Sequence, residues 1–322
     1  MSPTLTYTLT FILISNLGIA QVIDLKGNWK FRVGDKPTWS ATKFDDSGWE
    51  MIAAPSAWED EGFNGYDGFA WYRKKFDGRQ LTKDQNYQIN LGYIDDTDEV
   101  YVNGVLIGFS GSMPPKFKTA HNSERIYSLP NDIINFSGEN SIAIRIFDVT
   151  QGGGIIDGDI GIYRATKSRM LIDLQGLWYF TASQDWKPVS ENAEWKKIMV
   201  PSPWEHQGYS KYDGFGWYKR SFTLDNNLLG NETDLVLMLG KIDDFDKTYL
   251  NGKLIGKTND GERYSHSNSY NEIRSYTIPA NLLKKTGVNT IEVLVEDIGD
   301  IGGIYSGPIG IISKAAYERY FR

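Results

Sequence analysis

The 322-residue sequence contains no cysteine, only three histidines and no excess of basic residues. Without cysteine the chain cannot form a disulfide, a thiolate zinc site or a thiol nucleophile. The formal net charge is −7, and lysine and arginine are interspersed with acidic residues instead of gathering in a stripe. We therefore expect no nucleic-acid partner, because a phosphate backbone is bound through clustered positive charge.

Long apolar runs are also lacking. The apolar segment at residues 9–20 is too short to span a bilayer comfortably, and no Lys or Arg precedes it. It ends in Gly18, Ile19 and Ala20, a small-x-small pattern typical of signal-peptide cleavage. We predict a signal peptide over residues 1–20, a secreted or periplasmic protein, and no membrane association after cleavage.

What the chain does contain is a long tandem repeat, marked by its ten tryptophans. Five tryptophans of the first half recur in the same order in the second half, 146 to 149 residues later: Trp29, Trp39, Trp49, Trp58 and Trp71 correspond to Trp178, Trp186, Trp195, Trp204 and Trp217. A unit of roughly 140 residues has the size of a whole domain. We predict one domain over residues 22–164, a second over 171–313, and a C-terminal tail over 314–322.

Both units have the pattern of β-structure. Short β-branched or alternating runs occur at residues 88–94, 142–147, 235–239 and 291–295, and no long stretch has a helical apolar period. The pairs Asn103-Gly104 and Asn251-Gly252 stand between such runs and predict type I′ hairpins. Many short strands with frequent turns predict an all-β fold of sandwich type.

Several sequence motifs occur together in both units. PSAWE, YDGFAWYRKKF and IDDTDEVYVNGVLIG in the first unit correspond to PSPWE, YDGFGWYKRSF and IDDFDKTYLNGKLIG in the second. In combination they resemble the sugar-binding, galactose-binding-like domain of family 2 glycoside hydrolases, such as β-galactosidases and β-glucuronidases. They are also similar to the accessory jelly roll of sialate O-acetylesterases. The resemblance implies two tandem galactose-binding-like jelly-roll β-sandwiches that contact sugars.

The resemblance does not extend to the catalytic parts of these enzymes. Family 2 hydrolases carry their catalytic carboxylates in a TIM barrel of about 250 residues, for which two jelly rolls leave no room here. The esterase nucleophile lies in an α/β domain, and Ser110 in GFSGS lacks the strand-turn-helix context of such a serine. We therefore expect no enzyme activity from the chain alone, with weak hydrolysis by Glu59 and Asp67 as a minor alternative.

The loop from Trp58 to the YDG turn is the predicted sugar site of each unit. Sugars are bound by aromatic faces together with polar groups that reach the hydroxyls. The predicted contacts are Trp58, Glu59, Tyr66 and Asp67, with Trp204, Glu205, Tyr212 and Asp213 in the second unit. The alternative is that the carboxylates hydrogen-bond to backbone and shape the loop. Four tryptophans are expected in the core (Trp29, Trp71, Trp178 and Trp217), whereas Trp39 and Trp186 fit either role.

Acidic clusters precede both predicted hairpins and are candidate sites for Ca²⁺. Aspartate supplies the hard oxygen ligands that Ca²⁺ prefers, although the spacing is not that of an EF-hand. The candidate ligands are Asp95, Asp98, Asp243 and Asp246. The alternative is a structural role in which these side chains cap backbone N–H groups. No other cofactor is expected.

Three functions remain open at this point. The first is a secreted, non-catalytic protein that binds a polysaccharide or oligosaccharide. The second is an accessory subunit or fragment that works with a family 2 glycoside hydrolase or a carbohydrate esterase. The third is a structural module that docks a partner protein through an exposed apolar patch. The loops at residues 109–122 and 257–270 differ between the units and are expected to carry specificity.

Overall fold

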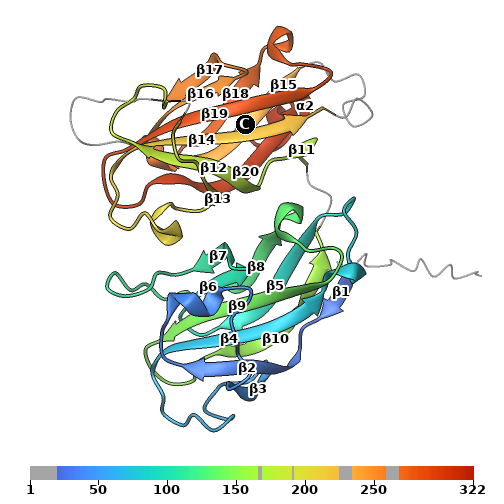
Figure 1. The fold of residues 1–322 in the computed structure, drawn as a ribbon, viewed down its shortest axis with the longest axis vertical. Helices are drawn as coiled ribbons and strands as arrows, with labels where there is room; N and C mark the ends of the chain where they lie inside the picture. The colour runs from blue at the N-terminus through green and yellow to red at the C-terminus, as the bar shows by residue number, and fades with distance from the viewer. Residues whose placement is uncertain (1–19, 166–168, 191, 225–233, 259–267) are drawn as a thin grey trace, which may run out of the picture.

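The computed structural model of the chain describes residues 20–165, 169–190, 192–224, 234–258 and 268–322. The predicted signal peptide lies outside this range except for its last residue. The described strands form two β-sandwiches stacked along the long axis of the molecule (Figure 1), and all strand pairs are antiparallel.

The first sandwich consists of a four-stranded and a six-stranded sheet. In spatial order the four-stranded sheet contains β1 (Gln21–Asp24), β10 (Ile155–Arg164), β5 (Tyr87–Ile94) and β8 (Glu124–Leu129). The six-stranded sheet contains β3 (Glu50–Ala54), β2 (Gly27–Val33), β4 (Gly68–Asp77), β9 (Glu139–Asp148), β6 (Thr97–Val102) and β7 (Val105–Ser110).

The second sandwich repeats this strand order. Its four-stranded sheet contains β11 (Ile172–Asp173), β20 (Gly303–Ser313), β15 (Leu235–Asp243) and β18 (Ile273–Ile278). Its six-stranded sheet contains β13 (Lys196–Val200), β12 (Gly176–Ser183), β14 (Gly214–Thr223), β19 (Val288–Asp297), β16 (Phe245–Leu250) and β17 (Lys253–Thr258). The same order in both halves confirms the all-β, tandem-sandwich prediction.

Short helical turns connect some strands, and one α-helix ends the chain. The 3-10 turns are η1 (Pro37–Ser40), η2 (Gly78–Gln80), η3 (Asn131–Ile133), η4 (Glu205–Gln207), η5 (Ser269–Asn271) and η6 (Ala280–Leu282). The tail forms α2 (Lys314–Tyr320), whose Tyr317 packs with Phe321 beside Val236 and Met238. No helix of the described residues is long and apolar enough to cross a bilayer.

The hairpins have the predicted backbone. Asn103 and Gly104 between β6 and β7 have φ angles of 51° and 80°, and Asn251 and Gly252 between β16 and β17 have φ angles of 49° and 76°. Positive φ at both central positions is the requirement of a type I′ turn, which explains the Asn-Gly pairs. Each sandwich then closes over its own apolar core, as Trp29 and Trp178 show by being fully buried.

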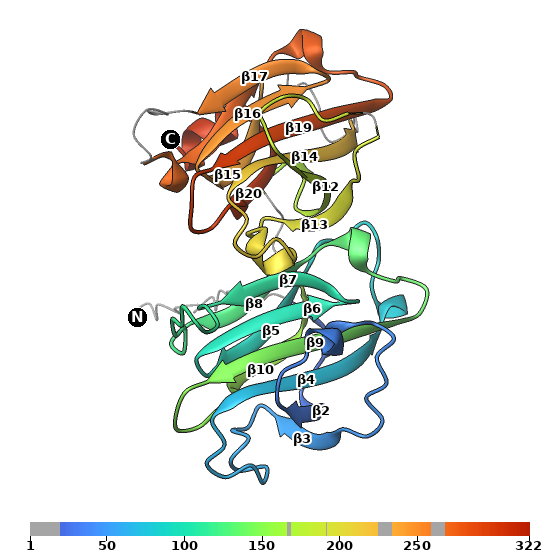
Figure 2. The ribbon, with the colours of Figure 1, turned by 60° about the vertical axis from the view of Figure 1, so that its left-hand side comes forward.

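The two sandwiches contact each other directly, with β7 of the first against β13 of the second (Figure 2). Met199 of β13 packs into the core cluster of the first sandwich. The Phe109 and His206 rings lie 4.3 Å apart, centre to centre. Because apolar and aromatic side chains are shared across the junction, the short connection between the sandwiches is not the only link between them.

Candidate functional site

The predicted stacking residues Trp58 and Trp204 are fully buried in the structure. Each indole N–H donates to a backbone carbonyl of its own loop, Tyr66 O and Tyr212 O respectively, at 3.1 Å. A Cβ added at Gly153 would lie 2.1 Å from the Trp58 ring, so backbone packs directly on that indole. Neither ring offers a free face to a sugar in this conformation.

The polar residues of the same loops bond mostly to backbone. Glu59 Oε2 accepts from Gly153 N and Glu205 Oε1 accepts from Gly302 N, both at 3.0 Å. Burial raises the pKa of Glu205 to about 7. The Tyr66 hydroxyl donates to Phe69 O and the Tyr212 hydroxyl to Phe215 O. These bonds agree with the alternative in which the side chains hydrogen-bond to backbone and shape the loop. The remaining predicted contacts, Asp67 and Asp213, are exposed beside them.

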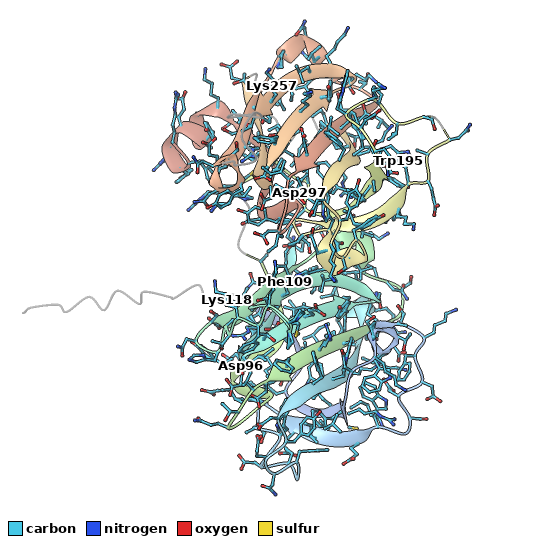
Figure 3. The ribbon with its side chains drawn as sticks, turned by 90° about the vertical axis from the view of Figure 1, so that its left-hand side faces the viewer. Asp96, Phe109, Lys118, Trp195, Lys257 and Asp297 are labelled. Carbon is cyan, nitrogen blue, oxygen red and sulfur yellow. The ribbon has the colours of Figure 1, made fainter. Side chains whose placement is uncertain are left out.

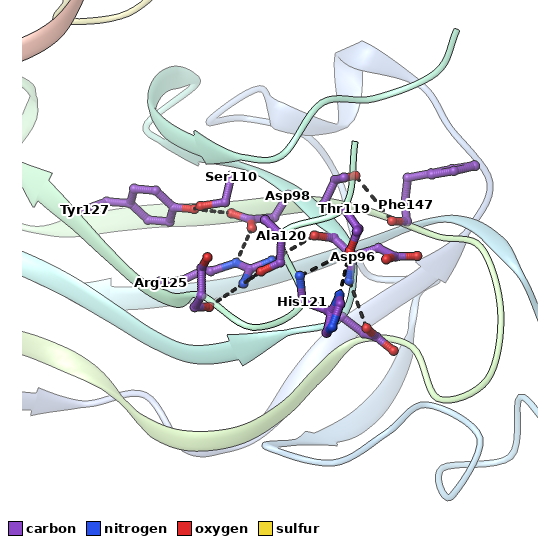
Figure 4. A network of polar contacts seen from close by, with 12 residues as sticks. Asp96, Asp98, Ser110, Thr119, Ala120, His121, Arg125, Tyr127 and Phe147 are labelled. Atoms are coloured by element: carbon purple, nitrogen blue, oxygen red, sulfur yellow. Dashed lines mark hydrogen bonds and ion pairs between the residues drawn. The ribbon is translucent and has the colours of Figure 1, made fainter. Parts of the chain in front are cut away.

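Two of the predicted calcium ligands, Asp98 and Asp246, are engaged in buried ion pairs. Arg125 Nε donates to Asp98 Oδ1 at 2.7 Å and the Tyr127 hydroxyl donates to Asp98 Oδ2 at 2.5 Å (Figure 4). Arg274 and Tyr276 make the equivalent contacts with Asp246. Burial raises the pKa of Asp98 to about 6, and the Arg125 charge opposes that rise. Both oxygens of Asp98 and of Asp246 have protein partners, so these residues do not fit a metal site.

The network also explains Ser110. Its hydroxyl pairs with the Tyr127 hydroxyl at 2.7 Å, and not with a histidine, so the serine-nucleophile geometry is absent at this residue. Arg125 donates to the carbonyl oxygens of Ala120 and Asp96 at 2.6 and 3.0 Å. The arginine therefore ties the end of the loop between β7 and β8 to the turn between β5 and β6.

The other two predicted ligands have different surroundings. Asp95 Oδ1 accepts from Asp96 N at 3.0 Å, as a local cap. Asp243 lies with Asp244 and Asp297, and one carboxylate oxygen of each is within 4.8 Å of the others. Burial, together with the neighbouring Asp244 and Asp297, raises the pKa of Asp243 to about 8. The structure thus groups Asp243 with two carboxylates outside the predicted set.

An open groove lies on the outer face of the six-stranded sheet of the second sandwich. We call it the aromatic groove; its volume is about 630 Å³ and its lining includes Trp186, Trp195, Trp217, Tyr249, Lys219 and Glu292. Trp186 is 58% exposed, and Trp195, labelled in Figure 3, is half-buried. Aromatic side chains that face solvent together are unusual and mark binding surfaces.

Charged groups lie beside the rings of the aromatic groove. Lys219 and Glu292 form an ion pair at 3.2 Å. Lys219 Nζ is 5.8 Å from the Trp195 ring centre, and Lys247 Nζ is 5.4 Å from that of Trp186. The groove therefore combines flat apolar faces with hydrogen-bond donors and acceptors, which are the components of a site for an amphipathic ligand.

The matching position in the first sandwich is filled by its own side chains. Trp39 packs edge-on against Trp49 and Trp71, with ring centres 5.1 and 6.2 Å apart, and Phe44 covers Trp49 at 5.7 Å. Trp39 and Trp49 are only 6% and 5% exposed. Three of the five paired tryptophan positions thus build a closed cluster in one sandwich and an open groove in the other.

One substitution between the repeats changes the contacts between the sheet and the loop that covers it. Arg73 of β4, which corresponds to Lys219 of β14, donates to Asp46 at 2.8 Å and to Ala41 O at 3.2 Å, and also to Trp39 O. The planar guanidinium reaches several acceptors at once and holds the 37–49 loop on the sheet. Lys219 has a single charged head, and it pairs with Glu292 where the first sandwich has Ala143.

Comparison with known proteins gives partial matches. Residues 183–300 match a family model described as the β-galactosidase second all-beta domain. A putative β-glucuronidase from Formosa agariphila is 27% identical over 161 residues, which cover 45% of this chain and 14% of that protein. The family-model match confirms the resemblance to β-sandwich domains of family 2 glycoside hydrolases.

Solved structures give matches of low similarity. A β-glucuronidase from an uncultured Clostridium species is 13% identical with a TM-score of 0.38, covering 83% of this chain and 41% of that one. A β-glucuronidase from Bacteroides uniformis is 14% identical with a TM-score of 0.37, covering 86% of this chain and 28% of that one. The chain spans less than half the length of each of these relatives.

Proposed function

We propose that this protein binds carbohydrate without catalysing a reaction of its own, and that the aromatic groove is the binding site. The supporting observation is the open cluster of Trp186, Trp195, Trp217 and Tyr249, whose counterpart in the first sandwich is closed. In this proposal the first sandwich is a support and the second carries the ligand.

The chemistry of the groove suits a sugar. The C–H face of a pyranose is apolar and stacks on an indole, while its hydroxyls require polar partners at the ring edge. Trp186 offers the most exposed face, and Lys219 and Glu292 supply a donor and an acceptor. A volume of about 630 Å³ is in the range of sites that hold small molecules, which corresponds to a short oligosaccharide segment. The predicted signal peptide is consistent with a secreted or periplasmic binding protein.

The experiment is calorimetric titration of the mature chain with a panel of neutral and acidic oligosaccharides. Trp186→Ala and Trp195→Ala are each expected to weaken binding about tenfold or more, which corresponds to about 1.4 kcal/mol. Tyr93→Ala is the control, because Tyr93 is an exposed aromatic residue (39%) of the first sandwich. Equal binding by wild type and both tryptophan variants would contradict the site, and no binding to any sugar would contradict the function.

A second candidate function is that of a part of a larger glycoside hydrolase. The supporting observation is that the match covers only 14% of the putative β-glucuronidase. A family 2 catalytic barrel without jelly rolls of its own would then gain glycosidase activity when mixed with this chain. Unchanged activity in such a mixture, with sugar binding by the chain alone, favours the first candidate.

A further inference from the structure

Three carboxylates converge where two strands of the second sandwich end. Asp243 is the last residue of β15, Asp244 follows it, and Asp297 is the last residue of β19. One oxygen from each lies within 4.8 Å of the others. Asp244 and Asp297 are only 5% and 2% exposed. Three negative groups this close and this poorly hydrated repel one another.

One of these oxygens is buried without a protein partner. Asp244 Oδ2 accepts from Ile298 N and Asp297 Oδ1 accepts from Gly299 N, both at 3.0 Å. The second oxygen of Asp297, Oδ2, is buried and accepts no hydrogen bond. A buried carboxylate oxygen without a partner is unfavourable, and native proteins usually satisfy it with a hydrogen bond, water or an ion.

The nearby arginine does not supply the missing positive charge. Arg274 Nε is paired with Asp246 at 3.2 Å, and its Nη1 donates to Glu272 O at 2.8 Å. Arg274 also donates to the backbone carbonyl of Asp244, and not to its carboxylate. The guanidinium is therefore held by Asp246 and by carbonyl groups, and among the residues that the structure describes no cation is paired with the three converging carboxylates.

We propose that Asp243, Asp244 and Asp297 bind a divalent cation of the calcium class. All three donors are oxygens, which favours hard cations over zinc or copper. Two oxygens that bind the same Ca²⁺ at about 2.4 Å lie at most about 4.8 Å apart, and the three observed separations are within this limit. The ion neutralises the cluster and links the β15–β16 turn to the end of β19.

The location suggests what the ion stabilises. Asp297 leads into the loop at residues 298–302, where Asp300 forms an ion pair with Lys116 of the first sandwich at 2.8 Å. Figure 3 places Asp297 at the end of the second sandwich that faces the first. Gly302 in the same loop donates to Glu205. The cation therefore fixes the start of the 298–302 loop, whose Asp300 and Gly302 contact Lys116 and Glu205, and its site is distinct from the aromatic groove.

The first sandwich provides an internal comparison. The equivalent residues are Asp95, Asp96 and Asp148, and Asp148 also has a buried, unpartnered Oδ2. Asp95 Oδ1 instead accepts a hydrogen bond from Asp96 N. Among the described residues, only the trio of the second sandwich brings three such oxygens within 4.8 Å. A single ion per chain is therefore expected.

The test is titration of the EDTA-treated, dialysed full chain with CaCl₂, followed by calorimetry and thermal unfolding. We expect one Ca²⁺ per chain and an increase in Tm of several degrees. Asp297→Asn and Asp243→Asn are expected to weaken Ca²⁺ binding at least tenfold, whereas Asp148→Asn keeps it. Circular dichroism establishes that each variant is folded, and the half-exposed position of Asp243 makes its variant the safer of the two.

Two results would overturn the proposal. The first is that neither CaCl₂ nor MgCl₂ at millimolar concentration binds to the chain or changes its Tm. The second is that Asp148→Asn weakens binding as much as Asp297→Asn. Because sugar binding at the aromatic groove is measured separately, failure of either proposal leaves the other intact.

Discussion

At the scale of single residues, the buried aspartates show how one side-chain type has different properties in different surroundings. Asp98 shares its burial with Arg125 and Tyr127, which bind both of its oxygens. Asp148 is equally buried, but it accepts only from Thr150 N at 3.3 Å, and its Oδ2 is unpartnered. Burial, and then the nearby charges of Asp95, Asp96 and Asp67, raise the pKa of Asp148 to about 7.

This shift makes Asp148 a source of pH-dependent stability. Because its folded-state pKa exceeds the ordinary value of 3.8, the folded state holds more protons than the unfolded state between about pH 4 and pH 7. The contribution of Asp148 to stability is therefore present below pH 4 and is lost as the pH rises through 7. Asp148→Asn stays neutral throughout, so it is expected to be more stable than wild type at pH 8 by at least about 1 kcal/mol.

Urea unfolding of both proteins at pH 5 and pH 8 measures the effect. The difference in unfolding free energy between variant and wild type should be larger at pH 8 than at pH 5. The same difference at both pH values would mean that the Asp148 carboxyl titrates normally. The measurement is made without divalent cations, so that the Asp243 cluster is free of metal in both proteins.

At the scale of elements, the 37–49 loop determines whether the outer face of a six-stranded sheet is open. In the first sandwich Arg73, 1% exposed, ties this loop down through Asp46 and backbone carbonyls. Its Nε, Nη1 and Nη2 atoms each donate to an acceptor of the loop itself. In the second sandwich Lys219 faces Glu292 on the sheet, and the aromatic groove stays open.

Arg73→Lys is expected to loosen this loop. Lysine keeps the charge but cannot reach Asp46 and the carbonyl groups together, so buried acceptors lose their donors and unfolding free energy falls by about 2 kcal/mol. Acrylamide should quench tryptophan fluorescence more strongly as Trp39 and Trp49 become accessible. Lys75→Ala is the control, because its ion pair with Glu139 is exposed and contributes little. Wild-type stability in Arg73→Lys would show that the guanidinium is not what closes the cluster.

At the scale of the whole molecule, the two sandwiches are joined by packing and by a few directed polar contacts. Asp132 Oδ2 accepts from Arg220 Nη1 at 2.8 Å and from Leu177 N at 3.2 Å, so one residue of the first sandwich satisfies two donors of the second. Phe109 and Met199 add ring and apolar contacts at the junction. The sandwiches are therefore expected to unfold as coupled units.

Asp132→Ala tests this coupling by scanning calorimetry. The substitution removes the acceptor that Arg220 and Leu177 N share. The midpoints of the unfolding transitions of the two sandwiches should therefore differ by several degrees more than in wild type. Lys116→Ala is a matched control, since it breaks an interdomain ion pair whose partners are 82% and 84% exposed. Superimposable traces for wild type and Asp132→Ala would show that the polar contacts do not couple the two halves.

The sequence by itself determined the duplication, the β class and the two Asn-Gly hairpins, because alternation and turn chemistry depend on residues that are neighbours in the chain. The family resemblance of the repeated motifs correctly indicated the sandwich fold. The sequence also placed Asp243 among the candidate calcium ligands, because the aspartates of residues 242–247 are close together in the chain.

Only the tertiary structure decided which side chains reach solvent and which meet. Trp58 and Trp186 look equally available in the sequence, yet one is fully buried and the other 58% exposed. Arg73 reaches Trp39 and Asp46 across about thirty residues of chain, and Asp297 meets Asp243 from a different strand. Exposure and convergence are properties of contacts between segments distant in the chain, and local patterns do not encode them.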